Sequence, residues 1–313
     1  MKILLIGASG QLGRDLMTTL AHHDVLGTAR GTLDIQDVKT EADWPSPIAL
    51  DVCDAIEVRA TITSFSPAIV INCAAYHRVD DIEKDASQAL AVNALAVQRL
   101  ALICREVDAA LVHISTDYVF DGAKRTPYVE TDPPNPLSAY GASKLAGELL
   151  LRAAWPKHYI IRTCGLYGLA GASGKAGGSG SAARSNSNFV NIMLKLAGEG
   201  RTIRVVNDQT CTPTFTQDLA RQIARLIETD AYGTYHITND GACTWYEFAC
   251  EIFHLAGVQA NVQPVTSAEY NAPARRPPYS VLENRGLKML GIDQMRPWRE
   301  ALAEYIALKM ARS

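Results

Sequence analysis

The chain has 313 residues, of which 48% are hydrophobic and 20% are charged, a composition typical of a globular protein with one large domain or two unequal ones. Its formal net charge is −3 and it contains no basic block, which argues against nucleic acid or a membrane surface as a partner. No apolar run is long enough for a signal peptide or a membrane span, and the scattered cysteines form no C-x-x-C motif, so we expect a cytoplasmic protein with reduced thiols.

The first half of the chain alternates predicted strands and helices. Apolar runs predict strands at residues 2–6, 24–30, 48–52, 68–75, 110–116 and 158–168. Amphipathic patterns predict helices at residues 14–23, 54–65, 84–106 and 139–153. Near-continuous apolar strands joined by helices indicate a parallel sheet covered on both faces. We therefore expect an α/β fold, a Rossmann-like doubly wound parallel sheet, in a domain of residues 1–165.

The second half is expected to form a smaller C-terminal α/β substrate domain of residues 166–313, with some segments interleaved with the first domain. Residues 169–188 are rich in Gly, Ser and Ala and are predicted to be a loop, either a lid or an idle insertion. The Gly174-Lys175 pair in this loop lacks the neighbours of a phosphate loop. Helices are predicted at 189–198, 217–228, 245–257 and from 297, and strands at 202–207 and 233–238.

A glycine-rich turn, GASGQLG, follows the first strand and opens the first helix. In this context Gly7 allows a tight turn, Gly10 lets the backbone approach a pyrophosphate, and Gly13 lets the helix pack closely on the strand. The helix N-terminus adds amide donors and the positive end of its dipole. The turn therefore predicts dinucleotide binding by Gly7, Ser9, Gly10, Gln11, Leu12 and Gly13.

The ends of the next strands are expected to complete this cofactor site. Arg30 ends the second strand, where an acidic residue would select NAD, so the sequence favours NADP with NAD as the alternative. The third strand ends in residues that could contact the adenine ring, and the fourth ends in small residues that permit close approach of the cofactor. These residues are Asp51 and Val52, and Cys73, Ala74 and Ala75.

The segment PLSAYGASKLAGE, residues 136–148, places Tyr140 and Lys144 four residues apart on one face of a helix. A tyrosine alone is a poor acid or base at neutral pH because its pKa is about 10. A lysine ammonium one turn away favours the phenolate and so lowers that pKa, which would make the pair a proton-transfer device. The same spacing is common on surface helices, so the other motifs decide between the two interpretations.

The motifs GASGQLG, NCAA, STDYVFDG, YGASK and DQTCTPT together resemble the extended short-chain dehydrogenase/reductase family, and within it the dTDP-4-dehydrorhamnose reductases, over nearly the whole chain. The resemblance implies NADPH-dependent reduction of dTDP-4-dehydro-L-rhamnose and places the catalytic threonine, tyrosine and lysine at Thr116, Tyr140 and Lys144. Tyr140 would donate a proton to the ketone oxygen, which Thr116 would polarise, and Lys144 would lower the tyrosine pKa and bond the nicotinamide ribose. The 4,6-dehydratases of this superfamily carry an Asp-Glu pair where this chain has Asp117-Tyr118, so water elimination would lack its base.

The resemblance also implies a nucleotide-sugar partner. Substrate contacts are expected from Thr116, Asp117, Tyr118, Asp208, Gln209 and Arg276. Arg276 would pair with the phosphates, whereas Asp208 and Gln209 could equally cap their loop. The histidines lack metal-ligand spacing, so no catalytic metal is expected, while a structural Mg²⁺ near Asp15 and Glu199 and a homodimer stay open.

Two departures from the family pattern concern the sugar rather than the reduction. Gly165 stands where the family has a tryptophan beside the sugar, and Cys211 stands where it has a glycine. One alternative is therefore a reductase of another nucleotide sugar. Another is a non-catalytic NADP-binding regulatory subunit, because that of methionine adenosyltransferase carries a similar set of motifs. Turnover of a keto sugar would separate an enzyme from a regulatory subunit.

Overall fold

The computed structural model describes residues 1–30, 47–169 and 188–312, and most of the predicted 169–188 loop lies outside these ranges. Its largest element is a seven-stranded sheet of order β11-β6-β5-β4-β1-β2-β3, in which all neighbours run parallel. Its strands are β1 (Lys2–Ile6), β2 (Asp24–Ala29), β3 (Ile48–Ala49), β4 (Ile69–Asn72), β5 (Ala110–Thr116), β6 (His158–Thr163) and β11 (Gly233–His236). The predicted doubly wound parallel sheet is confirmed, and the direction of winding reverses between β1 and β4.

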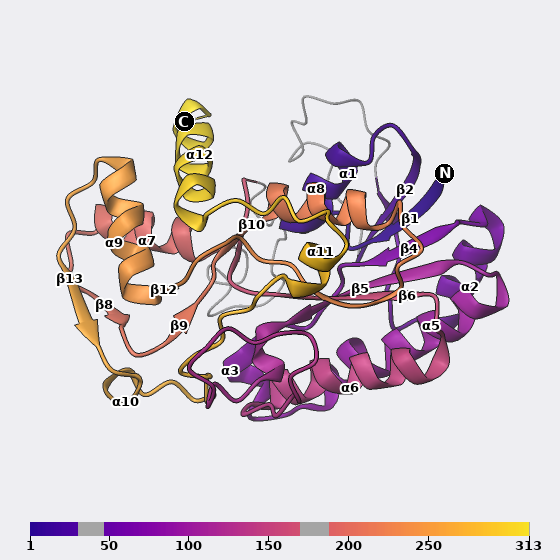
Figure 1. The fold of residues 1–313 in the computed structure, drawn as a ribbon, viewed down its shortest axis with the longest axis horizontal. Coiled ribbons are helices and arrows are strands. Elements are labelled where there is room, and N and C mark those ends of the chain that lie inside the picture. Colours follow the sequence, from indigo (N-terminus) through magenta and orange to yellow (C-terminus); the bar gives the residue numbers. More distant parts are fainter. Residues whose placement is uncertain (31–46, 170–187, 313) are drawn as a thin grey trace.

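Helices cover both faces of this sheet (Figure 1). One face carries α1 (Gln11–Thr19) and α8 (Thr216–Leu226), and the other carries α2 (Ala55–Phe65), α5 (Ala96–Glu106) and α6 (Ala139–Ala154). Because side chains alternate along a strand, Ile3 and Leu5 of β1 pack with α1 and α8, while Leu4 and Ile6 pack with α2 and α5. A strand that is apolar at every interior position is what a sheet with two buried faces requires.

The second half of the chain builds a smaller unit beside the sheet, on the left of Figure 1. It contains three two-stranded sheets, β7 (Leu166–Tyr167) with β10 (Thr214–Phe215), β9 (Thr210–Cys211) with β12 (Cys243–Thr244), and β8 (Ile203–Val206) with β13 (Val262–Val265). Its helices are α7 (Phe189–Gly198), α9 (Trp245–Ala256), α10 (Ser267–Tyr270) and α12 (Trp298–Ala311). Its core is rich in aromatic side chains, among them Tyr167, Phe215, Phe248, Trp298 and Tyr305. Strand β11 and helix α8 also come from this half of the chain, yet they belong to the main sheet and its covering layer.

Several predicted elements have different limits in the structure. The 158–168 strand is divided into β6 and β7 because Gly165 adopts a left-handed backbone, with φ of +54°, that turns the chain out of the sheet. The 48–52 strand is reduced to the two residues of β3. The 84–106 helix begins only at Ser87 and passes through α4 (Ser87–Leu90) and a π-helical turn (Ala91–Leu95) before α5. Short helices α3 (Val79–Ile82) and α11 (Arg285–Met289) and the 3-10 turn Asp117–Val119 were not predicted.

The continuous helix Ser87–Glu106 is long and apolar enough, by length and composition alone, to cross a membrane. The expectation that no segment would reach this length is therefore wrong. Half of its apolar window is buried inside the protein, and Val97 and Leu100 belong to the core beneath the sheet. Burial against the sheet accounts for the apolar composition, since a core helix meets the same criterion as a membrane span.

A buried ion pair lies behind the carboxyl end of the central strands. The Arg162 guanidinium of β6 donates three hydrogen bonds to the Glu148 carboxylate of α6, at 2.6 Å from Nη2 and at 3.0 and 3.2 Å from Nε. Both side chains are at most 4% exposed. The Ser115 hydroxyl of β5 donates to the same carboxylate at 2.5 Å, and the guanidinium lies 5.2 Å from the centre of the Phe120 ring. The ion pair and the Ser115 hydrogen bond thus connect α6 to strands β5 and β6.

Removal of one partner of this pair should destabilise the protein strongly. We expect Arg162→Met to lower the free energy of unfolding by about 3–5 kcal/mol, because the Glu148 charge would then be buried without a counter-charge. Urea denaturation followed by circular dichroism measures the change. The matched control is Arg59→Met, which breaks a half-exposed pair with Glu106 and should hardly move the midpoint. Equal losses in the two variants would contradict this account of the buried pair.

Candidate functional site

The candidate site is a cavity of about 490 Å³ at the carboxyl ends of the parallel strands. Strands β1, β4, β5 and β6 end around it, next to the point where the winding reverses. Open α/β sheets bind their ligands at this position because the loops on either side of the reversal diverge and leave a crevice. The cavity brings together many of the predicted residues, namely Gly7, Gly10, Gln11, Leu12, Gly13, Cys73, Ala75, Thr116, Asp117, Tyr118, Tyr140 and Lys144.

The glycine turn forms one wall of the cavity and has no room for a side chain at Gly13 and little at Gly7. Gly7 has a φ of +86°, and a Cβ built on it would lie 3.1 Å from the Ala74 nitrogen. A Cβ on Gly13 would lie 2.2 Å from the Gly7 carbonyl oxygen, a distance that no real Cβ tolerates. Gly10 caps the N-terminus of α1 without any side-chain hydrogen bond. The amides at this helix end are therefore open to an anion in the cavity.

Other predicted cofactor residues lie outside this cavity or have partners within the protein. Arg30 is exposed directly after β2, and the carboxylate of Asp51 accepts a hydrogen bond from the Cys53 backbone at 2.9 Å. Ser9, Val52 and Ala74 do not line the cavity either. Gln11 lines it, but its side-chain oxygen also accepts from the Gly168 backbone and from Asn188, each at 2.9 Å. Gln11 thus links the glycine turn to Gly168 and to Asn188.

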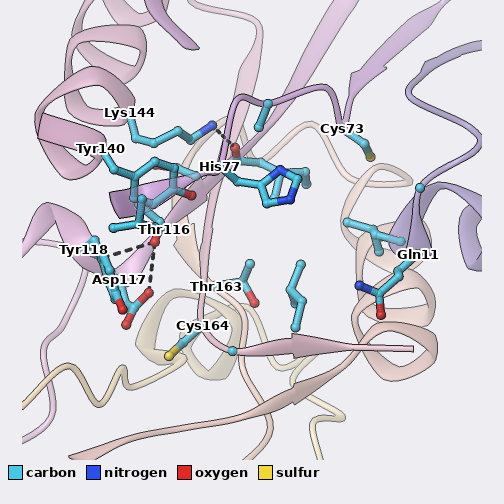
Figure 2. Close-up of a pocket in the computed structure, with 18 of the residues that line it drawn as sticks. Gln11, Cys73, His77, Thr116, Asp117, Tyr118, Tyr140, Lys144, Thr163 and Cys164 are labelled. Carbon is cyan, nitrogen blue, oxygen red and sulfur yellow. Dashed lines mark hydrogen bonds between the residues drawn. The ribbon is translucent and has the colours of Figure 1, made fainter. Parts of the chain in front are cut away.

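Tyr140 and Thr116 stand side by side in the cavity, with Lys144 behind them (Figure 2). Thr116 is the last residue of β5, and its hydroxyl donates to the Asp117 carboxylate at 2.9 Å and accepts from the Tyr118 amide at 3.2 Å. Ser115, its neighbour, instead bonds Glu148 on the other side of the strand. The alternation of side chains along β5 thus presents Thr116 to the cavity, as predicted.

Small residues between Tyr140 and Lys144 let α6 approach the rest of the site. A Cβ on Gly141 would lie 2.2 Å from the Tyr118 carbonyl oxygen, so only glycine fits there. The Ser138 hydroxyl caps the helix by accepting from the Gly141 amide at 3.2 Å. Ser143 receives a hydrogen bond at 3.0 Å from Asn93. The YGASK motif therefore carries packing and capping residues as well as the candidate catalytic pair.

Burial raises the pKa of Tyr140 above its usual value of 10, and the nearby Asp117 raises it further, while a hydrogen bond with Thr116 lowers it. The sequence predicted that Lys144 would lower this pKa, but in this structure the net shift is upward because burial and Asp117 dominate. The ammonium is directed elsewhere, toward the carbonyl oxygen of Ile114 at 2.6 Å. Burial lowers the pKa of Lys144 from 10.5 to about 8, and the negative charge of Glu148 partly offsets that fall.

A second cavity of about 530 Å³ adjoins the first, because Tyr118 and Trp245 line both. Gln209 and Arg276 line it, together with Arg204 and Arg275, which take part in no ion pair within the described ranges. The arginine predicted to bind phosphates, Arg276, holds Asp80 through two hydrogen bonds of 3.0 and 3.1 Å. Asp208 does not line either cavity and accepts three hydrogen bonds from Ser267, as a loop cap does.

The residues of the first cavity that the sequence analysis missed include His77, Thr163 and Trp245. His77 and Thr163 follow or end strands β4 and β6, so their position at a carboxyl strand end was the available signal. Trp245 opens α9 after a capping box of Thr244 and Glu247 that the sequence displays as T-x-x-E. That motif locates the start of the helix, but it does not reveal that the indole meets the cavity, where a Cβ on Gly165 would lie 3.2 Å from it.

A metal site is not evident in this cavity. Among the described residues, His22, His23 and Glu228 have ligand atoms within 4.8 Å of one another. The two histidines directly precede β2, at the amino ends of the parallel strands and therefore away from the cavity. The sequence missed this group because Glu228 follows α8, about 200 residues from the histidines. Asp15 is buried on α1 and Glu199 pairs with Arg201, so the structure brings neither into such a group.

Comparisons with known proteins agree with this geometry. The sequence profile of the family described as RmlD substrate binding domain matches residues 1–310. A dTDP-4-dehydrorhamnose reductase of Streptomyces griseus is 39% identical over 96% of this chain and 91% of its own. A dTDP-4-keto-6-deoxy-D-glucose reductase of Streptomyces niveus is 36% identical over 97% of this chain and 96% of its own.

A solved structure has the same fold. The dTDP-4-dehydrorhamnose reductase of Bacillus anthracis, crystallised in complex with NADP, superposes with a TM-score of 0.83 at 36% identity and covers 98% of this chain and 99% of its own. The resemblance inferred from the motifs is therefore confirmed over nearly the whole length.

The glycine turn provides a test of the cofactor wall. We expect Gly13→Ala to weaken NADPH binding by at least about tenfold, because its Cβ would displace the Gly7 carbonyl and with it the helix N-terminus. Fluorescence titration with NADPH measures the affinity. Gly198→Ala is the matched control, since a Cβ at this helical position meets nothing within 4 Å. An unchanged affinity in Gly13→Ala would show that the cofactor does not depend on this turn.

Proposed function

The chain belongs to the RmlD substrate binding domain family, and from that membership we propose that it reduces a nucleotide-linked 4-keto-6-deoxy sugar with NADPH, namely dTDP-4-dehydro-L-rhamnose to dTDP-L-rhamnose. The observation that carries the proposal is the placement of Thr116, Tyr140 and Lys144 around one cavity whose opposite wall is a glycine turn. The Streptomyces griseus reductase supports the substrate, and the NADP complex of the Bacillus anthracis reductase supports the cofactor.

The first cavity fits a dinucleotide. Gly7 and Gly13 let the turn pack directly on neighbouring backbone, and the uncapped N-terminus of α1 offers amides to a pyrophosphate. Cys73 and Ala75 would line the cofactor from the end of β4, and the exposed Arg30 would hold a 2′-phosphate. When bound, the nicotinamide supplies a hydride to the keto carbon.

The residues of the cavity supply the proton and hold the ketone. Tyr140 keeps its phenolic proton across the physiological range because its pKa is raised, so it serves as the acid that protonates the sugar oxygen. Thr116 stands beside it and would donate its hydroxyl proton to the same oxygen as negative charge develops there. The Lys144 ammonium would stabilise the tyrosinate left after proton transfer and donate to a ribose hydroxyl. In this structure Thr116 donates its one hydroxyl proton to Asp117, so the hydroxyl would turn from that carboxylate to the ketone when the substrate binds.

The second cavity would hold the nucleotide diphosphate. It opens from the first beside Tyr118 and Trp245, so a sugar in the first cavity places its phosphates in the second. Arg204 and Arg275 offer positive charge there, and Arg276 could exchange Asp80 for a phosphate. Gln209 supplies an amide on the same wall. We propose these residues, with Asp117 and Tyr118, as the substrate contacts, and we assign Asp208 to the loop cap.

A reductase of a different nucleotide sugar is the closest alternative. The Streptomyces niveus relative is named for a different keto sugar at 36% identity, so identity alone does not choose the substrate. Gly165 lines the first cavity, whereas Cys211 is buried in β9 and lines neither cavity. A regulatory subunit that only binds NADP would share the cavities and would oxidise no NADPH with any keto sugar.

The first test is NADPH oxidation with dTDP-4-dehydro-6-deoxyglucose and its 3,5-epimerase, followed by absorbance. We expect Tyr140→Phe to lower kcat by about 10²–10⁴-fold with NADPH affinity preserved, because only the transferred proton is removed. Tyr232→Phe, a tyrosine outside both cavities, serves as the control and should keep full turnover. NADPH binding without turnover in the unaltered protein would overturn the rhamnose assignment.

The low pKa of Lys144 predicts a basic limb in the pH profile. Burial disfavours the ammonium, so its charge is present below a pKa of about 8 and is lost as the pH rises through that value. We expect kcat/KM to be flat from pH 6.5 to 7.5 and to fall above about pH 8. Lys144→Arg should move the limb upward by at least about one pH unit, because a guanidinium stays charged. If the basic limb stays at the same pH in Lys144→Arg, the limb reports the titration of another group.

A further inference from the structure

His113 lies between Lys144 and Asn72 in the interior of the protein. It is the fourth residue of β5, and its side chain is fully buried. Its Nε2 atom is 3.3 Å from the Lys144 ammonium nitrogen, and its Nδ1 atom is 3.4 Å from the side-chain nitrogen of Asn72. Neither the glycine turn nor the triad accounts for a histidine at this position.

The Asn72 amide has a defined orientation. Its oxygen accepts a hydrogen bond from the Ala74 backbone N–H at 3.1 Å, so its NH₂ group faces His113. An NH₂ group is only a donor, and Nδ1 of His113 must therefore accept from it. A neutral imidazole has one protonated nitrogen, which places the His113 proton on Nε2, facing Lys144.

This arrangement matches only one charge state of the lysine. An Nε2–H group can donate to the Lys144 nitrogen if that nitrogen has a free lone pair, which an ammonium lacks. A charged Lys144 needs the other tautomer, in which Nε2 accepts and Nδ1 carries the proton. The Nδ1–H and the Asn72 NH₂ group, both donors, would then face each other. The Asn72 amide must therefore rotate so that its oxygen accepts from Nδ1–H, and it loses its hydrogen bond with the Ala74 N–H. The Ile114 carbonyl accepts from Lys144 in either state.

We propose that His113 is a positioning residue whose two tautomers match the charged and the uncharged Lys144, and that Asn72 transmits the change to the Ala74 amide at the cofactor wall. The proposal rests on the proposed function for the role of Lys144. It gives the ammonium a second acceptor beside Ile114 and gives the lone pair of the uncharged amine a donor, which a side chain of fixed polarity could not do. It also couples the lysine charge to a backbone N–H that lies against Gly7 of the glycine turn.

Other groups near Lys144 influence its pKa, but none of them takes the role proposed for His113. Tyr140 and Glu148 lie on its own helix, and Cys73 faces it from the end of β4. Glu148 is held by Arg162 and Ser115 and keeps its place when the lysine changes charge. His113 itself stays neutral, because burial and the Lys144 charge hold its pKa well below 6.5. Its response is therefore a change of tautomer at constant charge.

Nitrogen NMR of histidine-labelled protein tests the proposal, because the two tautomers have distinct ¹⁵N shifts. The His113 signal, identified by its loss in His113→Gln, should convert from the Nδ1–H form to the Nε2–H form as the pH rises from 6.5 to 9.5. The midpoint should lie near 8 and coincide with the titration of the Lys144 side chain, followed through its ¹³Cε signal. A single tautomer throughout the titration of Lys144 would overturn the proposal.

Two variants should hold His113 in one form each. Lys144→Arg keeps a positive charge and should give the Nδ1–H tautomer at every pH, whereas Lys144→Met has no charge and should give the Nε2–H tautomer. The same tautomer in both variants would contradict the coupling. These spectra need neither cofactor nor substrate. If the His113 tautomer changes with pH but the protein turns over no keto sugar, the proposed reduction is rejected and the coupling of His113 to Lys144 is retained. If the protein turns over the substrate while the tautomer stays fixed, the coupling is rejected and the reduction is retained.

Discussion

The close seating of α6 against β5 and the turn that follows it is the constraint on which the site depends. Gly141 and Gly147 have no room for a Cβ, which would lie 2.2 Å from the Tyr118 carbonyl and 2.1 Å from the Asn93 carbonyl. The helix therefore approaches its neighbours at the distance of backbone contact. This approach places Tyr140 beside Thr116 and inserts Lys144 and Glu148 into the interior, where water cannot compensate their charges.

Burial then determines how each ionisable group behaves. The Glu148 charge is matched by Arg162, whereas the hydrogen-bond partners of Lys144 among the described residues are a carbonyl and an imidazole, and the lysine loses part of its basicity. Tyr140 becomes a weaker acid than an exposed tyrosine and keeps its proton at neutral pH. The proposed catalytic roles thus depend on position in the fold as much as on residue type.

The second half of the chain contributes the other wall of the site and a route for a long substrate. Gly165 turns the chain from β6 into β7, and the space beside it is occupied by the indole of Trp245 from α9. Tyr118 and Trp245 border both cavities, so a ligand that spans them contacts both halves of the protein. A nucleotide sugar has this elongated shape, with the reacting ring at one end, the nucleoside at the other and the diphosphate between them.

Local patterns in the sequence determined much of this protein. Apolar strands separated by helices predicted the parallel sheet, GASGQLG predicted the turn at the end of β1, and the spacing of Tyr140 and Lys144 placed both on one helix face. The tertiary structure alone decided the partners of these residues. The orientation of Lys144 toward Ile114 and His113, the pairing of Arg276 with Asp80, and the position of Trp245 at the cavity join residues far apart in sequence. Burial and long-range contacts control pKa values and hydrogen bonds, and neither can be obtained from periodicity or spacing along the chain.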